Sequence, residues 1–239
     1  MTNDERQKSA LERWEKAKAE GRPIAEHILN ILKAGLSIAP FAGAIASLIT
    51  DYIPTARSQR LEQFAEQIAE DLNRLQGSVD AQYLQTDDFA FMFEKCFRAV
   101  AENPQREKLE SFRGILVNSA IRKDLKEEEK EYFLNLAMNL STVHIRILRF
   151  MATPEDYLQA ASIPASSIQG GFSTFFPVAL PGIQLDVIKS AFADLHSYGL
   201  INTDRSIFGT MTAGQGLTLL RGRVTELGNS FIMFCSVPK

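Results

Sequence analysis

Apolar residues recur at helical spacing over most of the chain. From 57 to 77 they fall three or four positions apart with Glu, Gln and Arg between them, which predicts an amphipathic helix ended by Gly77. A second helix follows a Thr86 cap and carries an aromatic stripe as far as Asn103. The same spacing predicts one helix around 109–120 and another from Lys126 to Leu140.

The last hundred residues have a different pattern. A helix starts after Ser141-Thr142, and an irregular insert rich in Gly, Ser and Pro follows over 162–182. The next helix starts at Ile183, stops at Gly199 and runs into a strand.

Two short apolar runs then bracket the glycine-containing turn 212–216, which predicts a β-hairpin. A final helix begins near Thr225. Three helices followed by a hairpin is the element order of a winged helix.

Near the front of the chain, residues 34–50 carry no charge. Pro40 removes a backbone donor, so we expect two short helices joined at this proline and ended before Pro54, each below the roughly 20 apolar residues that span a bilayer. Small residues recur every four positions, which lets helices approach closely. The candidate packing or membrane face consists of Gly35, Ala39, Pro40, Gly43 and Ser47.

This apolar hairpin has three interpretations. It is a core element packed under the helices that follow, a segment that meets a membrane after a trigger, or a face for self-association. The sequence leaves these alternatives open.

Together these patterns predict a mainly α fold. The expected organisation is a charged N-terminal helix, an apolar helical hairpin, a helical middle domain and a winged-helix-like domain with a small β-hairpin. Their respective limits are 1–22, 23–54, 55–141 and 142–239.

Composition argues against a strongly basic nucleic-acid-binding protein and against a disulfide-rich secreted protein. The 239 residues are 45% apolar and 23% charged, with a net charge of −3 and a pI near 5.7, so no global field attracts nucleic acid. Cys96 and Cys235 lie among apolar neighbours and are expected to be buried thiols rather than a disulfide. The charged N-terminus is not a secretory signal, and we expect a cytoplasmic protein.

No catalytic pattern is present in the sequence. His27, His144 and His196 share no metal-ligand spacing with each other or with the cysteines. There is no G-x-S-x-G nucleophile motif, and the glycines around 209–216 match no phosphate-binding loop. We therefore predict no catalytic, metal-binding or cofactor-binding residues, no cofactor and no small-molecule substrate.

A winged helix suggests DNA binding, but the charges give it little support. From Val143 to Lys239 there are seven basic and six acidic residues, and the expected recognition helix has a single lysine. The alternative of a DNA-binding regulator depends on four basic residues: Lys189, Arg205, Arg221 and Arg223.

Residues 89–239 also carry short motifs found together in one family. They are the Leu140-Ser141 step with Ile145 and Leu148, the exit Leu195-Gly199-Leu200-Ile201, and Thr225-Glu226-Leu227-Gly228 with Phe231 and Cys235. In these the chain resembles the abortive-infection alpha-like family of bacterial phage-resistance proteins. The resemblance implies a role in antiviral defence and supplies no catalytic residues.

The sequence thus predicts a non-enzymatic effector or adaptor in the cytoplasm, peripheral to the inner membrane if the apolar hairpin engages lipid. It would act in phage defence through a protein partner or self-association. Nucleic acid is the partner in the alternative interpretation.

Overall fold

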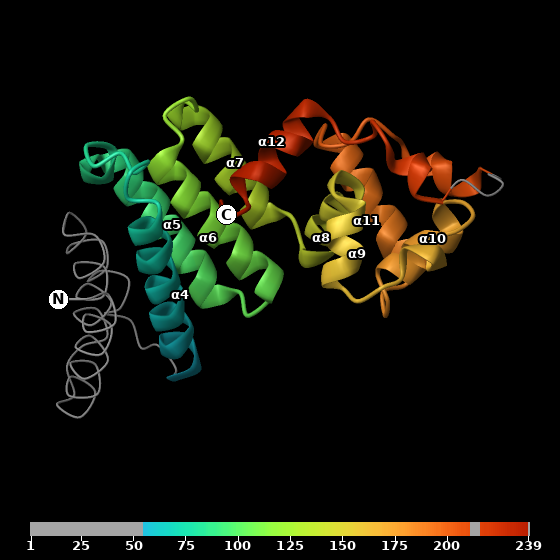
Figure 1. Cartoon of the computed structure of the whole chain (residues 1–239), viewed down its shortest axis with the longest axis horizontal. Helices are drawn as coiled ribbons and strands as arrows, with labels where there is room; N and C mark the ends of the chain where they lie inside the picture. The colour runs from blue at the N-terminus through green and yellow to red at the C-terminus, as the bar shows by residue number, and fades with distance from the viewer. Residues whose placement is uncertain (1–54, 211–215, 239) are drawn as a thin grey trace. The chain divides into compact units, whose positions relative to one another are not determined.

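The computed structural model describes residues 55–210 and 216–238, and these are mainly helical (Figure 1). They contain nine α-helices and no β-strand. The charged helix predicted over 1–22 and the apolar hairpin predicted over 23–54 lie outside the described residues. Among the described helices, none combines the length and the apolar character needed to cross a bilayer.

The chain divides into two compact units. The first unit consists of two segments of the chain, one that ends at Asn135 and one that begins at Cys235. The second unit spans Leu136 to Phe234. The second unit is therefore inserted between the last helix of the first unit and its C-terminal segment.

The first unit is a bundle in which α5 packs on α6 and α4 packs on both. Its elements are α4 (Thr55–Arg74), the 3-10 helix η1 (Tyr83–Gln85), α5 (Asp87–Glu102), α6 (Arg106–Ile121) and most of α7 (Glu127–Asn139). The predicted cap is confirmed, since the Thr86 side chain accepts a hydrogen bond from Phe89 N at 3.2 Å. The aromatic stripe of α5 is buried, and Phe93 stacks on Phe97 at 4.2 Å between ring centroids.

The second unit packs its other helices around α8 and α11. Its elements are the end of α7, α8 (Thr142–Ala152), α9 (Pro154–Ala160), η2 (Ala165–Ser167), α10 (Phe172–Ala179), α11 (Leu185–Ser197), η3 (Arg205–Gly209), η4 (Gly216–Leu220) and α12 (Glu226–Phe234). Buried phenylalanines form its core, with ring centroids 5.2 to 6.1 Å apart: Phe150, Phe172, Phe175, Phe176, Phe192 and Phe208.

The insert at 162–182 is more regular than predicted. Its phenylalanines lie on α10, which places all three of them in the aromatic core. Burial of these rings explains the helix, because three apolar side chains within five residues reach one core only when the chain coils.

The predicted β-hairpin is not formed by the described residues on either side of 211–215. Both apolar runs are 3-10 helices, η3 and η4. The Asp204 carboxylate accepts a hydrogen bond from Ser206 N at 2.8 Å, and the resulting turn directs Phe208 into the aromatic core. Within residues 55–210 and 216–238, strand-like pairing is limited to one antiparallel bridge between Ile201 and Val224.

Candidate functional site

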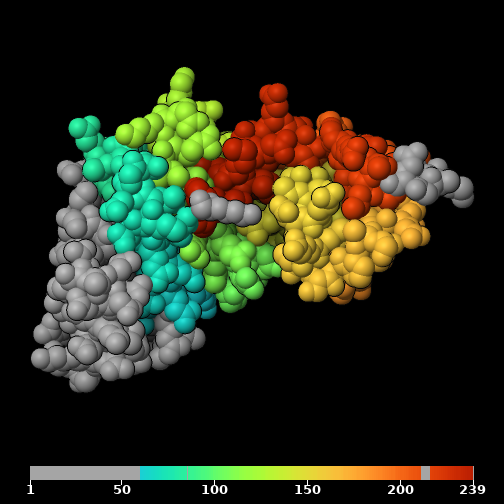
Figure 2. All heavy atoms as spheres, viewed as in Figure 1, coloured from blue at the N-terminus to red at the C-terminus, as the bar shows by residue number. Residues whose placement is uncertain are grey.

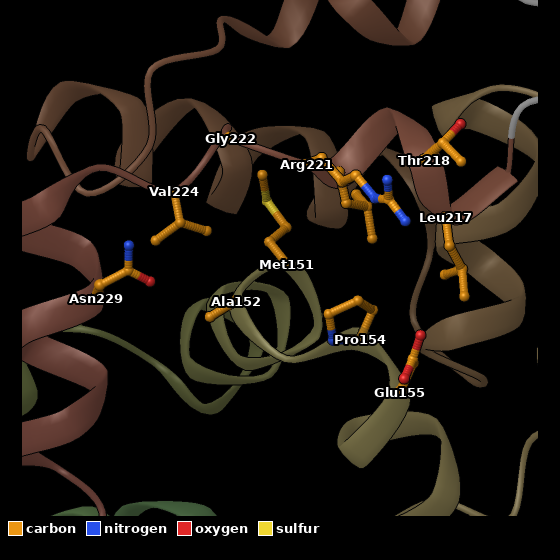
Figure 3. A pocket seen from close by; sticks show the side chains of 11 residues that line it. Met151, Ala152, Pro154, Glu155, Leu217, Thr218, Arg221, Gly222, Val224 and Asn229 are labelled. Carbon is orange, nitrogen blue, oxygen red and sulfur yellow. The ribbon is translucent and has the colours of Figure 1, made fainter.

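A hollow of about 260 Å³ lies in the second unit between the α8–α9 junction and the segment that follows η4 (Figure 3). Pro154 starts α9 and turns the chain sharply after α8, so that the end of one helix and the start of the next form one wall. The opposite wall comes from η4, Arg221 and Gly222, and Asn229 of α12 closes one end.

The hollow has an apolar interior and a polar rim. Met151 and Leu220 are buried in its floor, whereas Glu155 and Arg221 are exposed on the rim. A carboxylate and a guanidinium on either side of an apolar floor suit an extended peptide or a protruding side chain. The polar groups of the peptide main chain could meet the charged rim, while an apolar side chain fills the floor. The lining has no histidine, cysteine or lysine, and it offers no activated nucleophile.

The four basic residues of the predicted DNA surface do not form one patch. Lys189 of α11 and Arg205 of η3 line a second, more open hollow of about 460 Å³. In that hollow the Lys189 ammonium lies 3.5 Å from the carboxylate of Asp186, which offsets part of its charge. Arg221 lines the first hollow instead.

Arg223 is directed into the protein. Its guanidinium donates to Thr203 Oγ1 at 3.0 Å and to the carbonyl oxygen of Leu219, and it lies 5.5 Å from the ring centroid of Phe172. These contacts tie the end of η4 to the aromatic core. Arg223 therefore has a structural role in the second unit.

One polar cluster escaped the sequence analysis. Ser141 Oγ lies 2.7 Å from His144 Nδ1, and His144 Nε2 lies 3.1 Å from Asp194 Oδ2. The order of serine, histidine and carboxylate matches that of a hydrolytic triad. The S-x-x-H spacing at the start of a predicted helix was the available signal, since it places both side chains on the first turn.

The contacts of this cluster are those of a helix cap. Ser141 N donates to His144 Nδ1 at 3.0 Å, and Ser141 and His144 form a reciprocal capping box at the start of α8. Asp194 then connects the imidazole to α11. Neither of the two hollows is lined by these three residues. The cluster fastens α8 to α11.

Cys96 is buried and its thiol is not set up for catalysis. Burial raises the pKa of the Cys96 thiol, which keeps it protonated and a poor nucleophile. The described residues contain no group of three His, Cys, Asp or Glu side chains that could hold a metal ion. The predicted packing residues Gly35, Ala39, Pro40, Gly43 and Ser47 fall outside the described part of the chain.

Comparison with known proteins identified no relative of this chain. No protein-family model matches the chain, and no match was found among curated proteins or solved structures. The resemblance of residues 89–239 to the abortive-infection alpha-like family therefore stays a prediction.

Proposed function

We propose that this chain is a non-enzymatic adaptor or effector that acts through protein contacts made by its second unit. The observation that carries the proposal is the exposed side of α11, the helix that the sequence predicts as a recognition helix. Val187 and Tyr198 are 47% and 40% exposed there. Ser190, Asp194 and Ser197 are the other exposed residues at helical spacing between them.

This composition favours a protein partner. Phosphate contacts need Lys and Arg, and the exposed positions just named carry none. Tyrosine is enriched in protein interfaces and often adds much of their binding energy, and Tyr198 is the residue of this surface that fits that pattern. The hollow of Figure 3, in the same unit, offers a partner a recess with one positive and one negative side chain on its rim.

The role in phage defence rests on the family resemblance. A test of action by contact needs an exposed residue whose substitution changes the surface without unfolding the chain. Val187 meets that requirement because its side chain is largely outside the core.

The test combines infection with direct crosslinking. Cells that express the chain are challenged with phage in the wild-type and Val187→Asp forms, and the plating efficiency of the phage is measured. A photoreactive amino acid at position 187 identifies what the surface contacts during infection, and the crosslinked protein is then purified and its affinity measured. We expect Val187→Asp to abolish both protection and binding.

Gln159→Asp is the matched control, because it places the same charge at an exposed position of α9 in the same unit. It should retain protection and binding. Equal protection by the wild-type and Val187→Asp proteins, both shown to be folded, would contradict the proposal.

DNA binding is the second candidate, and one observation favours it: Lys189 and Arg205 come together at one hollow. If these residues contact phosphates, duplex DNA should bind at about 50 mM salt, and the affinity should fall as salt rises. Replacing both by glutamine should then reduce the salt slope by about 2. Absence of binding at that salt concentration would remove this candidate.

A further inference from the structure

The second hollow borders the exposed side of α11. Ser190 belongs to both, since it is exposed on that side of the helix and also lines the hollow. The other described lining residues come from α11 and η3: Asp186, Lys189, Arg205, Ser206, Phe208 and Gly209. A partner bound against the exposed side of α11 therefore has this hollow beside it.

The lining of this hollow carries a net positive charge. The Arg205 side chain is exposed and forms no hydrogen bond or ion pair in the described part of the chain. The Lys189 ammonium lies 3.5 Å from the carboxylate of Asp186, whose side chain is 93% exposed. Water and salt screen so exposed a pair strongly. Among the described lining residues, two cations thus stand against one weakly held carboxylate.

This arrangement suits a single phosphate group. A phosphate monoester carries a charge of about −1.5 to −2 near pH 7 and presents three acceptor oxygens. The guanidinium of Arg205, the ammonium of Lys189 and the hydroxyl of Ser190 offer donors to such a group. Because its charge exceeds that of a carboxylate, a phosphate also competes well with Asp186 for Lys189.

The positive surface is large enough for one phosphate but not for a nucleic-acid backbone. A duplex presents one charge per about 1.7 Å of its axis, and its affinity comes from cations that neutralise several phosphates. Arg221 lines the first hollow instead, where the red atoms of the segment after η4 meet the yellow atoms of α8 and α9 in Figure 2, and Arg223 is directed into the protein. Val187, Asp194 and Tyr198, on the exposed side of α11, add no cation.

We propose that this hollow binds a phosphorylated side chain of the protein partner that contacts α11, with Arg205 and Lys189 on the phosphate. The inference rests on the proposed function, because it names the chemistry of that partner. The position of Ser190, shared by the hollow and the α11 surface, is what favours a phosphate carried by a protein over the free ion. Recognition of phosphorylated segments by clustered basic residues is a recurrent mode of binding.

The first test titrates the purified full-length protein by calorimetry. The probe is a tripeptide with a central phosphoserine and blocked ends, and the same peptide without phosphate is its comparison. Only the phosphopeptide should bind. Arg205→Gln and Lys189→Gln should each weaken its binding about tenfold or more, the loss of one charge-assisted hydrogen bond. Asp186→Asn should strengthen it, because that substitution removes the competing carboxylate.

Lys126→Gln is the matched control, since it removes an exposed positive charge from the first unit, and it should bind like the wild type. No binding of the phosphopeptide, or equal affinity for the wild-type and Arg205→Gln proteins, would overturn the proposal. Inorganic phosphate that binds as tightly as the phosphopeptide would assign the hollow to the free ion. Duplex DNA that displaces the phosphopeptide and binds more tightly would assign the two cations to nucleic acid. Either result would also overturn it.

The partner crosslinked at position 187 separates this inference from the proposed function. Phosphatase treatment of the purified partner should weaken its binding to the wild-type protein but have little effect on its already weak binding to Arg205→Gln. Equal binding before and after phosphatase treatment would overturn phosphate recognition while the partner itself stands. If Val187→Asp leaves protection and partner binding unchanged, the proposed function fails, whereas the phosphopeptide titration is measured without any partner.

Discussion

Gly228 of α12 packs directly on the carbonyl oxygen of Leu200, at the exit from α11. A Cβ atom at position 228 would overlap that oxygen and would lie 2.8 Å from Val224 Cγ1. Thr225 holds the two segments in place: its hydroxyl donates to the carbonyl oxygen of Gly199 at 2.7 Å and accepts from Gly228 N at 3.0 Å. The Thr-x-x-Gly step thus joins α12 to the end of α11.

We therefore expect Gly228→Ala to destabilise the second unit by about 1–3 kcal/mol, the usual cost of overpacking a filled interior. Chemical denaturation followed by circular dichroism measures this loss. Gly209→Ala is the control, because nothing lies within 4 Å of a Cβ atom at that position. It should change stability by less than about 0.5 kcal/mol. Equal effects of the two substitutions would contradict the packing described here.

The buried ion pair of the first unit provides a second prediction. Arg113 contacts Asp71 at 2.5 and 2.9 Å, and Asp71 has a side chain that is 5% exposed. Asp71→Asn should lower the free energy of unfolding by about 3 kcal/mol, because it leaves a partly buried guanidinium without its counter-charge. Asp124→Asn removes a largely exposed partner of Arg122 and should cost about 1 kcal/mol or less. Similar losses in both variants would show that burial does not decide the strength of the pair.

The Ser141–His144–Asp194 cluster should behave as a cap. Ser141→Ala should destabilise the protein by about 1 kcal/mol, whereas Ser197→Ala, which removes an exposed hydroxyl on α11, should have a smaller effect. A fluorophosphonate probe should not label the wild-type protein. Labelling that disappears in both Ser141→Ala and His144→Ala would instead identify a nucleophile.

Lys108 should make stability depend on pH. The residue is 4% exposed, its ammonium lies 5.4 Å from the Phe112 ring centroid, and burial lowers its pKa. Between this lowered pKa and the ordinary value of about 10.4, the unfolded chain binds more protons than the folded one. In that window the stability of the wild-type protein relative to Lys108→Met should therefore rise with pH.

Denaturation at a series of alkaline pH values measures this difference. Lys126 is exposed, so the same comparison with Lys126→Met should show a much smaller slope. A flat difference for Lys108→Met would show that its ammonium group is not desolvated in the folded protein.

The membrane interpretation of residues 34–50 leads to a separate prediction. If this run inserts into lipid, the protein should float with liposomes under the triggering condition, and Gly43→Glu should abolish flotation because a charge in the hydrocarbon is costly. Gly43→Ala keeps the position small and apolar and should float like the wild type. Absence of lipid association under every condition tried would count against insertion.

Local sequence was sufficient where a single element buries its own apolar face. The periodicity from Leu61 to Leu72 predicted α4, and Thr86 predicted the start of α5, because spacing and capping depend on residues a turn or two apart. The helix that begins beside Thr225 was predicted for the same reason.

The predicted hairpin failed for the opposite reason. A short apolar run beside a glycine has too few residues for its periodicity to distinguish a strand from a turn. The conformation of the first run is decided by Phe208, because its ring packs on Phe172 and Phe192 from distant parts of the chain. Burial in that aromatic core, together with the Asp204 cap, favours a 3-10 turn.

The sequence by itself determined that the described part of the chain is mainly helical, where most of the helices in that part begin and end, and that no conventional catalytic motif is present. Only the tertiary structure decided that Arg223 turns inward, that His144 reaches Asp194, and that Cys235 packs against Gly114. The features determined by the sequence depend on contacts between residues a few positions apart, and the spacing of apolar residues reveals those contacts. The features decided by the tertiary structure depend on contacts between residues far apart in the chain, and no local pattern specifies which distant surface a side chain will meet.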